Sequence, residues 1–218
     1  MTSEPACAIR KFRKDDRKDV RRICCATALK GKPSSLFFAG DEILADALTL
    51  YFTDHEPESC FVAECNGAVT GYIIGSRDVS VVKRLARTSI MPRLIVKALF
   101  RGTLFKSKNI RFIWHCLVSF LKREFDEPDF SKTYPATLHI NIQEGWRDVG
   151  LGAKLIEAYL SYLIAQGVAG VHFATLSEQA SKFFQKQQFE LLYAGRRSYF
   201  RYILGCDIPI YIYGKRLS

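Results

Sequence analysis

The sequence contains no hydrophobic run long enough to cross a membrane. The longest uncharged apolar stretch, Phe112–Leu121, has ten residues and is interrupted by His115 and Ser119. A spanning helix needs about 20 apolar residues. The first residues, MTSEPACAIRKFRKDD, also lack the apolar core of a signal peptide. These absences predict a soluble, cytoplasmic protein without a membrane span.

The cysteine patterns typical of zinc sites and disulfide frameworks are missing as well. The chain has seven cysteines, an odd number, with no C-x-x-C pair and no histidine at zinc-finger spacing from a cysteine pair. Cys24 and Cys25 are adjacent, and Cys60 and Cys65 flank an expected strand. Free cysteines are usually buried and persist as thiols in a reducing compartment. We therefore expect free, buried thiols and no metal site.

The composition is that of a folded protein. The 218 residues are 48% hydrophobic and 13% aromatic, which suffices for a large core and argues against disorder, collagen-like repeats and coiled-coil rods. The length favours one domain. The formal net charge is +10, so a polyanionic partner is one interpretation.

Apolar periodicity and turn residues predict an alternation of helices and strands. A first helix is expected over residues 15–28, and a second one, capped by Ser34 or Ser35, carries the apolar residues of 43–51. Asn66-Gly67 predicts a tight hairpin. Strands are expected at residues 8–12, 60–64, 69–74, 137–142, 168–176, 189–194 and 208–214, and further helices at 150–166 and 179–186.

This order predicts a mixed sheet with helices on its faces, an α/β or α+β arrangement. The strands at 137–142 and 168–176 are joined by a helix. A strand–helix–strand unit has a right-handed crossover, so these two strands should run parallel.

A loop with two glycines joins the strand at 137–142 to the following helix. Gly150 and Gly152 would let the backbone approach a ligand closely, and the first-turn amides of the helix have no intrahelical partners. Successive amides turned inward make a concave anion site, for which a pyrophosphate is a natural occupant. The alternative is a tight turn that binds nothing. Arg147 and the strand–loop–helix order favour the ligand.

The loop resembles the R/Q-x-x-G-x-G/A sequence with which the Gcn5-related N-acetyltransferases (GNAT) bind the pyrophosphate of acyl-CoA. Its residues are Arg147, Asp148, Val149, Gly150, Leu151, Gly152 and Ala153. The segment from Ser177 to Phe189 is similar to the family's N-x-x-A-x-x-x-Y-x-K-x-G-F element. The resemblance covers about three-quarters of the chain and leaves residues 76–133 as a helical insertion between the third and fourth strands.

The resemblance implies a single domain with a mixed, mostly antiparallel sheet that is splayed between its fourth and fifth strands and flanked by helices. Acetyl-CoA would lie in the gap, with its pyrophosphate on residues 147–153. Asn141 and Ile142 would pair with the pantetheine, and Ser177 and Phe184 would also contact the coenzyme. The implied activity is an acetyl-CoA-dependent N-acetyltransferase, in which an amine attacks the thioester directly in a ternary complex.

Four positions depart from the family's pattern. Asn141 stands where many relatives carry a carboxylate base, and an amide cannot take a proton at neutral pH. Phe184 replaces the tyrosine proposed to protonate the leaving thiolate. Ser177 replaces the usual asparagine, and Gln188 replaces the usual glycine.

His139 is the candidate for the missing base. It lies two residues before Asn141, so its side chain faces the same side of the strand. An imidazole has an unperturbed pKa of about 6.5, which suits general-base catalysis. His172 and Glu144 are the other candidates, and a hydrogen-bonded core histidine is the alternative. The catalytic roles of His139 and Asn141 therefore stay open.

Because both proton-transfer residues are absent, the alternative function is a non-catalytic acyl-CoA-binding module that engages an acidic partner through a basic surface. The acceptor of an enzyme could be the amine of a small metabolite, an antibiotic, a polyamine or a peptide. A homodimer stays open, and nucleic acid is disfavoured as a partner.

The positive charge is concentrated in one segment. Residues 77–123, called the basic segment below, contain twelve basic residues and one acid, whereas the other 171 residues carry a net charge of −1. Arg93, Lys97 and Arg101 form a stripe at i, i+4 spacing on an expected helix, where like charges repel.

Several interpretations of the basic segment remain. It is a solvated helix face, or a surface for an acidic substrate, for the CoA phosphates, for a membrane or for nucleic acid. Its aromatic residues Phe112, Trp114 and Phe120 are expected in the core rather than on a base-stacking surface.

Overall fold

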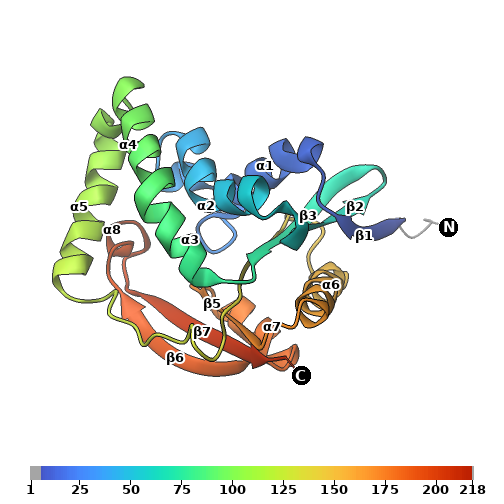
Figure 1. Ribbon diagram of the computed structural model, residues 1–218. Helices are drawn as coiled ribbons and strands as arrows, with labels where there is room; N and C mark the ends of the chain where they lie inside the picture. Colours follow the sequence, from blue (N-terminus) through green and yellow to red (C-terminus); the bar gives the residue numbers. More distant parts are fainter. Residues whose placement is uncertain (1–5, 218) are drawn as a thin grey trace.

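The structure, a computed structural model, describes residues 6–217 and contains two antiparallel sheets (Figure 1). The larger has the strand order β1-β2-β3-β4 and the smaller has the order β5-β7-β6. The strands are β1 (Cys7–Lys11), β2 (Phe61–Cys65), β3 (Ala68–Ser76), β4 (Thr137–Ile142), β5 (Gly170–Thr175), β6 (Glu190–Arg197) and β7 (Ile208–Arg216).

The two sheets meet at the beginnings of β4 and β5 and separate toward the ends of these strands. Ala136 and Val171 form an isolated parallel bridge, in which the Ala136 amide donates to Gly170 at 3.0 Å and its carbonyl accepts from His172 at 2.9 Å. Among the described residues, β4 has no further strand partner on this edge, whereas its other edge pairs with β3. The predicted parallel direction and the splayed sheet are thus confirmed.

Helices cover both faces of the larger sheet (Figure 1). Alternate residues of a strand point to opposite faces. Ile73 of β3 accordingly packs in one cluster with Leu155 of α6, and its neighbours Tyr72 and Ile74 pack in another with Ile23 of α1. Outside the basic segment the helices are α1 (Arg17–Thr27), α2 (Asp41–His55), α6 (Leu151–Ala165), α7 (Glu178–Lys186) and α8 (Arg201–Leu204), with single turns η1 (Lys14–Asp16), η2 (Ser34–Leu36) and η3 (Pro57–Ser59).

The predicted cap of the second helix is wrong. α2 begins at Asp41, after Gly40, and Ser34 instead begins the short turn η2. The Ser34 hydroxyl donates to the Asp41 carboxylate at 2.7 Å, so the serine contacts the start of α2 from a separate turn. The one-turn helix α8 was not predicted from the sequence.

The basic segment is helical, as expected. Ala98 of α4 and the ring of Phe112 of α5 pack in one cluster with Phe37, Phe200 and Ile208. Its elements are α3 (Val79–Leu85), the π-helical turn η4 (Ala86–Ile90), α4 (Met91–Phe100), η5 (Thr103–Phe105) and α5 (Ser107–Leu121).

Two of the three aromatic residues expected in the core are instead on the surface. Phe112 is half-buried in the cluster, but Trp114 is 60% exposed and Phe120 is 66% exposed. A helix that packs on one side leaves its other apolar side chains outside.

Two of the three charges in the stripe are paired within the fold. Lys97 Nζ lies 2.6 Å from Glu42 and 3.0 Å from Asp46, and Arg101 pairs with Glu42. Both acids belong to α2, and Asp46 also pairs with Arg21. The repulsion expected along the stripe is therefore offset by α2.

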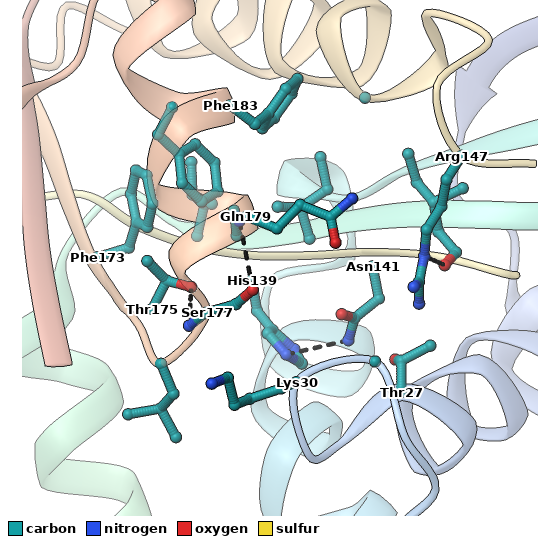
Figure 2. A pocket seen from close by; sticks show the side chains of 18 of the residues that line it. Thr27, Lys30, His139, Asn141, Arg147, Phe173, Thr175, Ser177, Gln179 and Phe183 are labelled. Carbon is teal, nitrogen blue, oxygen red and sulfur yellow. Dashed lines mark hydrogen bonds between the residues drawn. The ribbon is translucent and has the colours of Figure 1, made fainter. Parts of the chain in front are cut away.

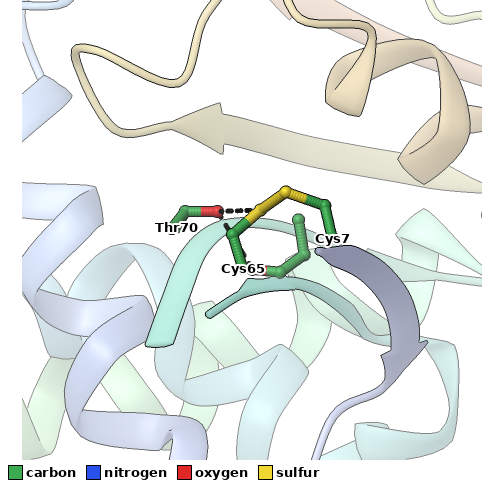
Figure 3. Close-up of a disulfide and its surroundings, with 4 residues drawn as sticks. Cys7, Cys65 and Thr70 are labelled. Atoms are coloured by element: carbon green, nitrogen blue, oxygen red, sulfur yellow. Dashed lines mark hydrogen bonds between the residues drawn. A yellow bond between two sulfur atoms is a disulfide. The ribbon is translucent and has the colours of Figure 1, made fainter. Parts of the chain in front are cut away.

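The expectation that every cysteine is a free thiol is wrong. Cys7 of β1 and Cys65 of β2 are register partners and form a disulfide, beside which lies the hydroxyl of Thr70 (Figure 3). The two cysteines are 58 positions apart, and only the pairing of β1 with β2 brings them together. Cys24, Cys25, Cys60, Cys116 and Cys206 are free, and the first three are buried.

No helix within residues 6–217 combines the length and apolar character that crossing a bilayer requires.

Candidate functional site

A cavity of about 780 Å³ opens where β4 and β5 separate. Figure 2 shows side chains from β4, the glycine loop, α7 and the end of α1 around it. Ten of the residues singled out in the sequence line it: His139, Asn141, Ile142, Arg147, Asp148, Gly150, Gly152, Ala153, Ser177 and Phe184.

Two residues of the glycine loop do not line the cavity. Leu151 is 2% exposed and packs in the core under α6, and Val149 is 56% exposed, away from the lining. The role expected of residues 147–153 rests on their backbone amides, so the positions of these two side chains leave that prediction unchanged.

The glycine loop presents free backbone donors. Gly150 has φ +82°, in the left-handed region, and a Cβ there would meet no atom within 4 Å. No side chain caps α6, and the first amide bonded back along the helix is that of Lys154, to Gly150. The preceding amides of the turn, with the positive end of the helix dipole, suit an anion.

Arg147 ties the loop to its surroundings. Its Nε donates to the carbonyl of Ile142 at 3.3 Å, and its guanidinium lies against Gly31, where a Cβ would come within 2.8 Å of Nη1. Gly31 also lines the cavity. A Cβ at Gly31 would displace the guanidinium, so Gly31 helps to place Arg147, a role that sequence reasoning missed.

Three polar side chains on β3 and β4 contact one another at the cavity wall. Asn141 Nδ2 donates to the Tyr72 hydroxyl at 2.9 Å and lies 3.2 Å from His139 Nε2. His139 Nδ1 lies 3.4 Å from the same hydroxyl. Figure 2 shows His139 and Asn141 side by side.

The environment of His139 differs from the expected one. Desolvation by burial lowers the pKa of His139 from 6.5 to about 4, because a charged imidazole is disfavoured away from water. The side chain is therefore neutral at pH 7, and it is a weaker base than the unperturbed imidazole assumed from the sequence. Burial likewise raises the pKa of the Tyr72 phenol well above its usual range.

Phe184 is part of an aromatic cluster. It is 4% exposed and packs against Phe173, Phe189 and Tyr213. The hydroxyl of Tyr213 is bonded to Ser181 at 2.6 Å, and no tyrosine is among the described residues that line the cavity. The cavity thus offers no phenol that could donate a proton.

Ser177 acts as the cap of α7. Its hydroxyl accepts from the Ala180 amide at 3.3 Å, and its own amide donates to Thr175 at 3.3 Å. Serine and asparagine are both favoured at this position, so the departure from the family's asparagine keeps the cap.

The other two candidate bases lie outside the cavity lining. His172 Nδ1 is 2.5 Å from the carbonyl of Tyr134, and burial lowers the pKa of His172. Glu144 is exposed on the loop. Neither is among the residues around the cavity.

Sequence reasoning missed one whole wall of the cavity. Thr27, Lys30 and Leu48 come from α1, the turn after it and α2, and Gln179 and Lys182 come from α7. The α1 and α2 residues are ordinary in the sequence and distant from the glycine loop. Within residues 6–217, no group of three or more His, Cys, Asp or Glu could hold a metal ion.

No model of a known protein family matches this sequence, and no curated protein matches it. Solved structures do match. SsHAT aligns with a TM-score of 0.70 at 24% identity, over 98% of this chain and 100% of that one. The chain has the fold of the GNAT acetyltransferases. The predicted class, antiparallel sheets flanked by helices, is confirmed.

Two further GNAT-fold structures extend the comparison. Polyamine N-acetyltransferase from Drosophila melanogaster aligns with a TM-score of 0.59 at 14% identity, over 97% of this chain and 100% of that one. yncA from Salmonella typhimurium, solved with its cofactor acetyl-CoA, aligns with a TM-score of 0.55 at 13% identity, over 98% of this chain and 95% of that one. The likeness in fold thus extends over 97–98% of this chain in these three structures.

Proposed function

We propose that this protein is an acetyl-CoA-dependent N-acetyltransferase, which transfers an acetyl group directly to an amine in a ternary complex. The observation that carries the proposal is the glycine loop. Its unpartnered amides begin α6 beside the cavity, and the cavity is also lined by β4, one edge of which has no strand partner beyond Ala136 among residues 6–217. The acetyl-CoA bound by a protein of the same fold supports the choice of cofactor.

The residues present fit this cofactor. The open space at Gly150 admits a pyrophosphate against the amides, and Arg147 lies beside the loop. The backbone groups of β4 that face away from β3, at Ile140 and Ile142, can pair with the amides of a pantetheine, as a strand would, whereas the Asn141 backbone faces β3. Ser177 and Phe184 line the same cavity. The cofactor would supply an acetyl thioester. Positioning of the amine and acceptance of its proton would fall to residues of the protein.

The reacting end of the cavity lies beside His139. This side chain is neutral at pH 7, so an amine that arrives unprotonated meets no fixed positive charge on it. We assign His139 the role of proton acceptor and Asn141 that of holding the imidazole. Because the pKa of about 4 makes His139 a weak base, most of the acceleration is assigned to holding amine and thioester together.

The charges around the cavity favour one class of acceptor. Among the described lining residues the one acid, Asp148, belongs to the glycine loop, while Lys30 is one of the lining cations. A polyamine needs carboxylates for its second cation, and Lys30 repels it. Although a neighbour of this fold is a polyamine N-acetyltransferase, we propose a small-molecule or peptide amine that is otherwise neutral or anionic.

A non-catalytic acyl-CoA-binding module is the second candidate. Asn141 and Phe184 favour it, because neither side chain can exchange a proton at neutral pH. Calorimetry with acetyl-CoA, followed by thiol release over a panel of amines, separates the candidates. Turnover of any amine supports the enzyme, and binding without turnover supports the module.

The cofactor site has a matched pair of variants. Gly145 and Gly150 both have positive φ and open space at the Cβ position, but only Gly150 lines the cavity. Gly150→Asp should weaken acetyl-CoA binding by at least about 100-fold, since it sets a carboxylate beside the pyrophosphate. Gly145→Asp carries the same strain and charge and should change the affinity less than about threefold. Equal affinities for the two variants would contradict the assignment.

A further inference from the structure

The surface of α4, η5 and α5 is unusually apolar. Twelve of the seventeen large hydrophobic side chains exposed among the described residues lie between Met91 and Leu121. Phe100 is 89% exposed, and Phe105 is 69% exposed. These twelve residues, called the apolar patch, are Met91, Ile95, Val96, Leu99, Phe100, Phe105, Ile110, Ile113, Trp114, Leu117, Phe120 and Leu121.

The patch is surplus to the packing of the fold. On α5, Phe112 and Cys116 pack against the core at helical spacing, and Ser119 on the same side is fully buried. A second apolar stripe, which includes Ile113, Leu117 and others, lies on a different side of the same helix and is exposed. A helix needs only one apolar face to pack on a domain, and exposed apolar patches of this extent mark interaction sites.

The segment that carries the patch is also rich in positive charge. From Val79 to Arg123 the sequence has no acidic residue. Lys97 and Arg101 face α2 and are paired there. Eight other exposed basic side chains of this segment form no ion pair with a carboxylate of residues 6–217: Arg84, Arg87, Arg93, Lys106, Lys108, Arg111, Lys122 and Arg123. Two of them have other partners, since Lys108 donates to the Ser35 carbonyl and Arg111 lies over the Tyr202 ring.

This combination selects among the partners. In a two-fold dimer the same patch would face itself and bring the basic side chains together, so a second copy is disfavoured. Nucleic acid would use the positive charges but not exposed Ile, Leu and Val side chains. An anionic lipid surface uses both, because apolar side chains enter the acyl boundary while Lys and Arg reach the headgroups.

We propose that α4 and α5 dock the protein on the surface of a membrane that contains anionic lipids. Figure 1 shows both helices at one edge of the molecule, away from α6 and the glycine loop, so docking leaves that side of the fold free. Contact is with one leaflet, as no helix of the described chain could span the bilayer.

The test is co-sedimentation of the whole chain with vesicles of phosphatidylcholine, alone or mixed with phosphatidylglycerol, at low and high salt. Binding should require phosphatidylglycerol and fall with salt. Trp114 should shift its fluorescence to shorter wavelength on binding, measured in a Trp146→Phe background. Absence of binding, or equal binding to both vesicles, would overturn the proposal.

Matched variants separate the contribution of apolar insertion from that of electrostatic attraction. Phe100→Ser with Phe120→Ser should lower vesicle affinity at least about tenfold, because the apolar insertion is lost. Leu191→Ser, at an exposed apolar site on β6 outside the patch, should not. Arg93→Glu with Arg123→Glu should lower vesicle affinity at least about 20-fold. Lys18→Glu with Lys32→Glu makes the same change of charge outside the basic segment and should lower vesicle affinity far less. Circular dichroism checks that each variant is folded.

Other partners give distinct results. A dimer in sedimentation equilibrium that Phe100→Ser with Phe120→Ser dissociates, without vesicle binding by the original chain, assigns the patch to a second copy. RNA retention at low salt without vesicle binding assigns it to nucleic acid. Either result overturns the proposal. The readouts use no cofactor and no amine, so they are independent of the proposed transferase activity.

Discussion

The amide of Asn141 donates a 2.9 Å hydrogen bond to the hydroxyl of Tyr72, a fully buried residue on the neighbouring strand. The two residues are register partners of β4 and β3. The phenol lies behind the cavity wall and fixes the side chains of both Asn141 and His139. The residue at the position of the family's base is thereby held by a residue that does not line the cavity.

Tyr72→Phe removes this support. We expect the free energy of unfolding to fall by about 1 kcal/mol, since Asn141 loses a hydrogen-bond partner, and kcat to fall severalfold because His139 and Asn141 are released. Tyr51→Phe is the control: its hydroxyl bonds Glu56 and Ser76 away from the cavity. A kcat changed equally by both variants would contradict the positioning role of Tyr72.

His139→Gln should lower kcat by about 100-fold, at the low end of general-base effects, and leave the Kd for acetyl-CoA unchanged. An unaltered kcat would remove His139 from the proton path. The exposed His55→Gln is the control.

The same variant tests the pH dependence of stability. Burial lowers the pKa of folded His139 from 6.5 to about 4, so between these values the unfolded state binds more protons. Stability from this residue is complete above pH 6.5 and is lost as the pH falls toward 4. Urea unfolding across this range should show a smaller acid-induced loss in His139→Gln than in the original chain. Equal losses would show that burial does not hold His139 neutral.

Lys30→Glu should change acceptor preference. A carboxylate at this position attracts a second cation, so kcat/KM for a polyamine relative to a neutral amine should rise about tenfold. Lys32→Glu, in the same turn but outside the cavity lining, is the matched control. A preference that shifts equally in both variants would point to a general charge effect.

Gln188→Gly should stabilise the protein. Gln188 has φ +61° after α7, and the amide of Phe189 closes the turn on Phe184 at 3.1 Å, an arrangement that favours glycine. We expect a gain of about 1 kcal/mol in the free energy of unfolding. Gln187→Gly, where φ is −83°, should give no gain. Chemical denaturation measures both, and a loss at Gln188 would contradict the account.

The disulfide between Cys7 and Cys65 gives a prediction for the thiols. In denaturant without reductant, five of the seven cysteines should react with an alkylating agent. Cys7→Ser should lower the free energy of unfolding by about 2–4 kcal/mol, because the cross-link restrains the unfolded chain, whereas Cys206→Ser should not. Seven reactive thiols would show that the bond does not form.

Local patterns predicted much of the fold. The strand at 137–142 and the Asn66-Gly67 hairpin occur where alternation and turn chemistry place them. The glycine loop could be found because its residues are contiguous. Features that depend on strand register could not be predicted from the sequence. The disulfide and the contact of Tyr72 with Asn141 are two such features.

The electrostatics of the site also could not be predicted from the sequence. The pKa of His139 depends on how deeply β4 is covered, and the surface position of Trp114 depends on which side of α5 meets the core. Lys30 enters the cavity through the path of the chain after α1 rather than through any motif.

The ion pairs between α4 and α2 have a thermodynamic consequence. Lys97 joins α4 to Asp46, two residues before Leu48, which lines the cavity. The surface helix α4 is therefore ion-paired to α2, the helix that carries Leu48 at the cavity. If the proposed membrane docking shifts α2, it changes the affinity of the cavity for the acceptor. By reciprocity, acceptor binding then changes the affinity for the membrane by the same factor.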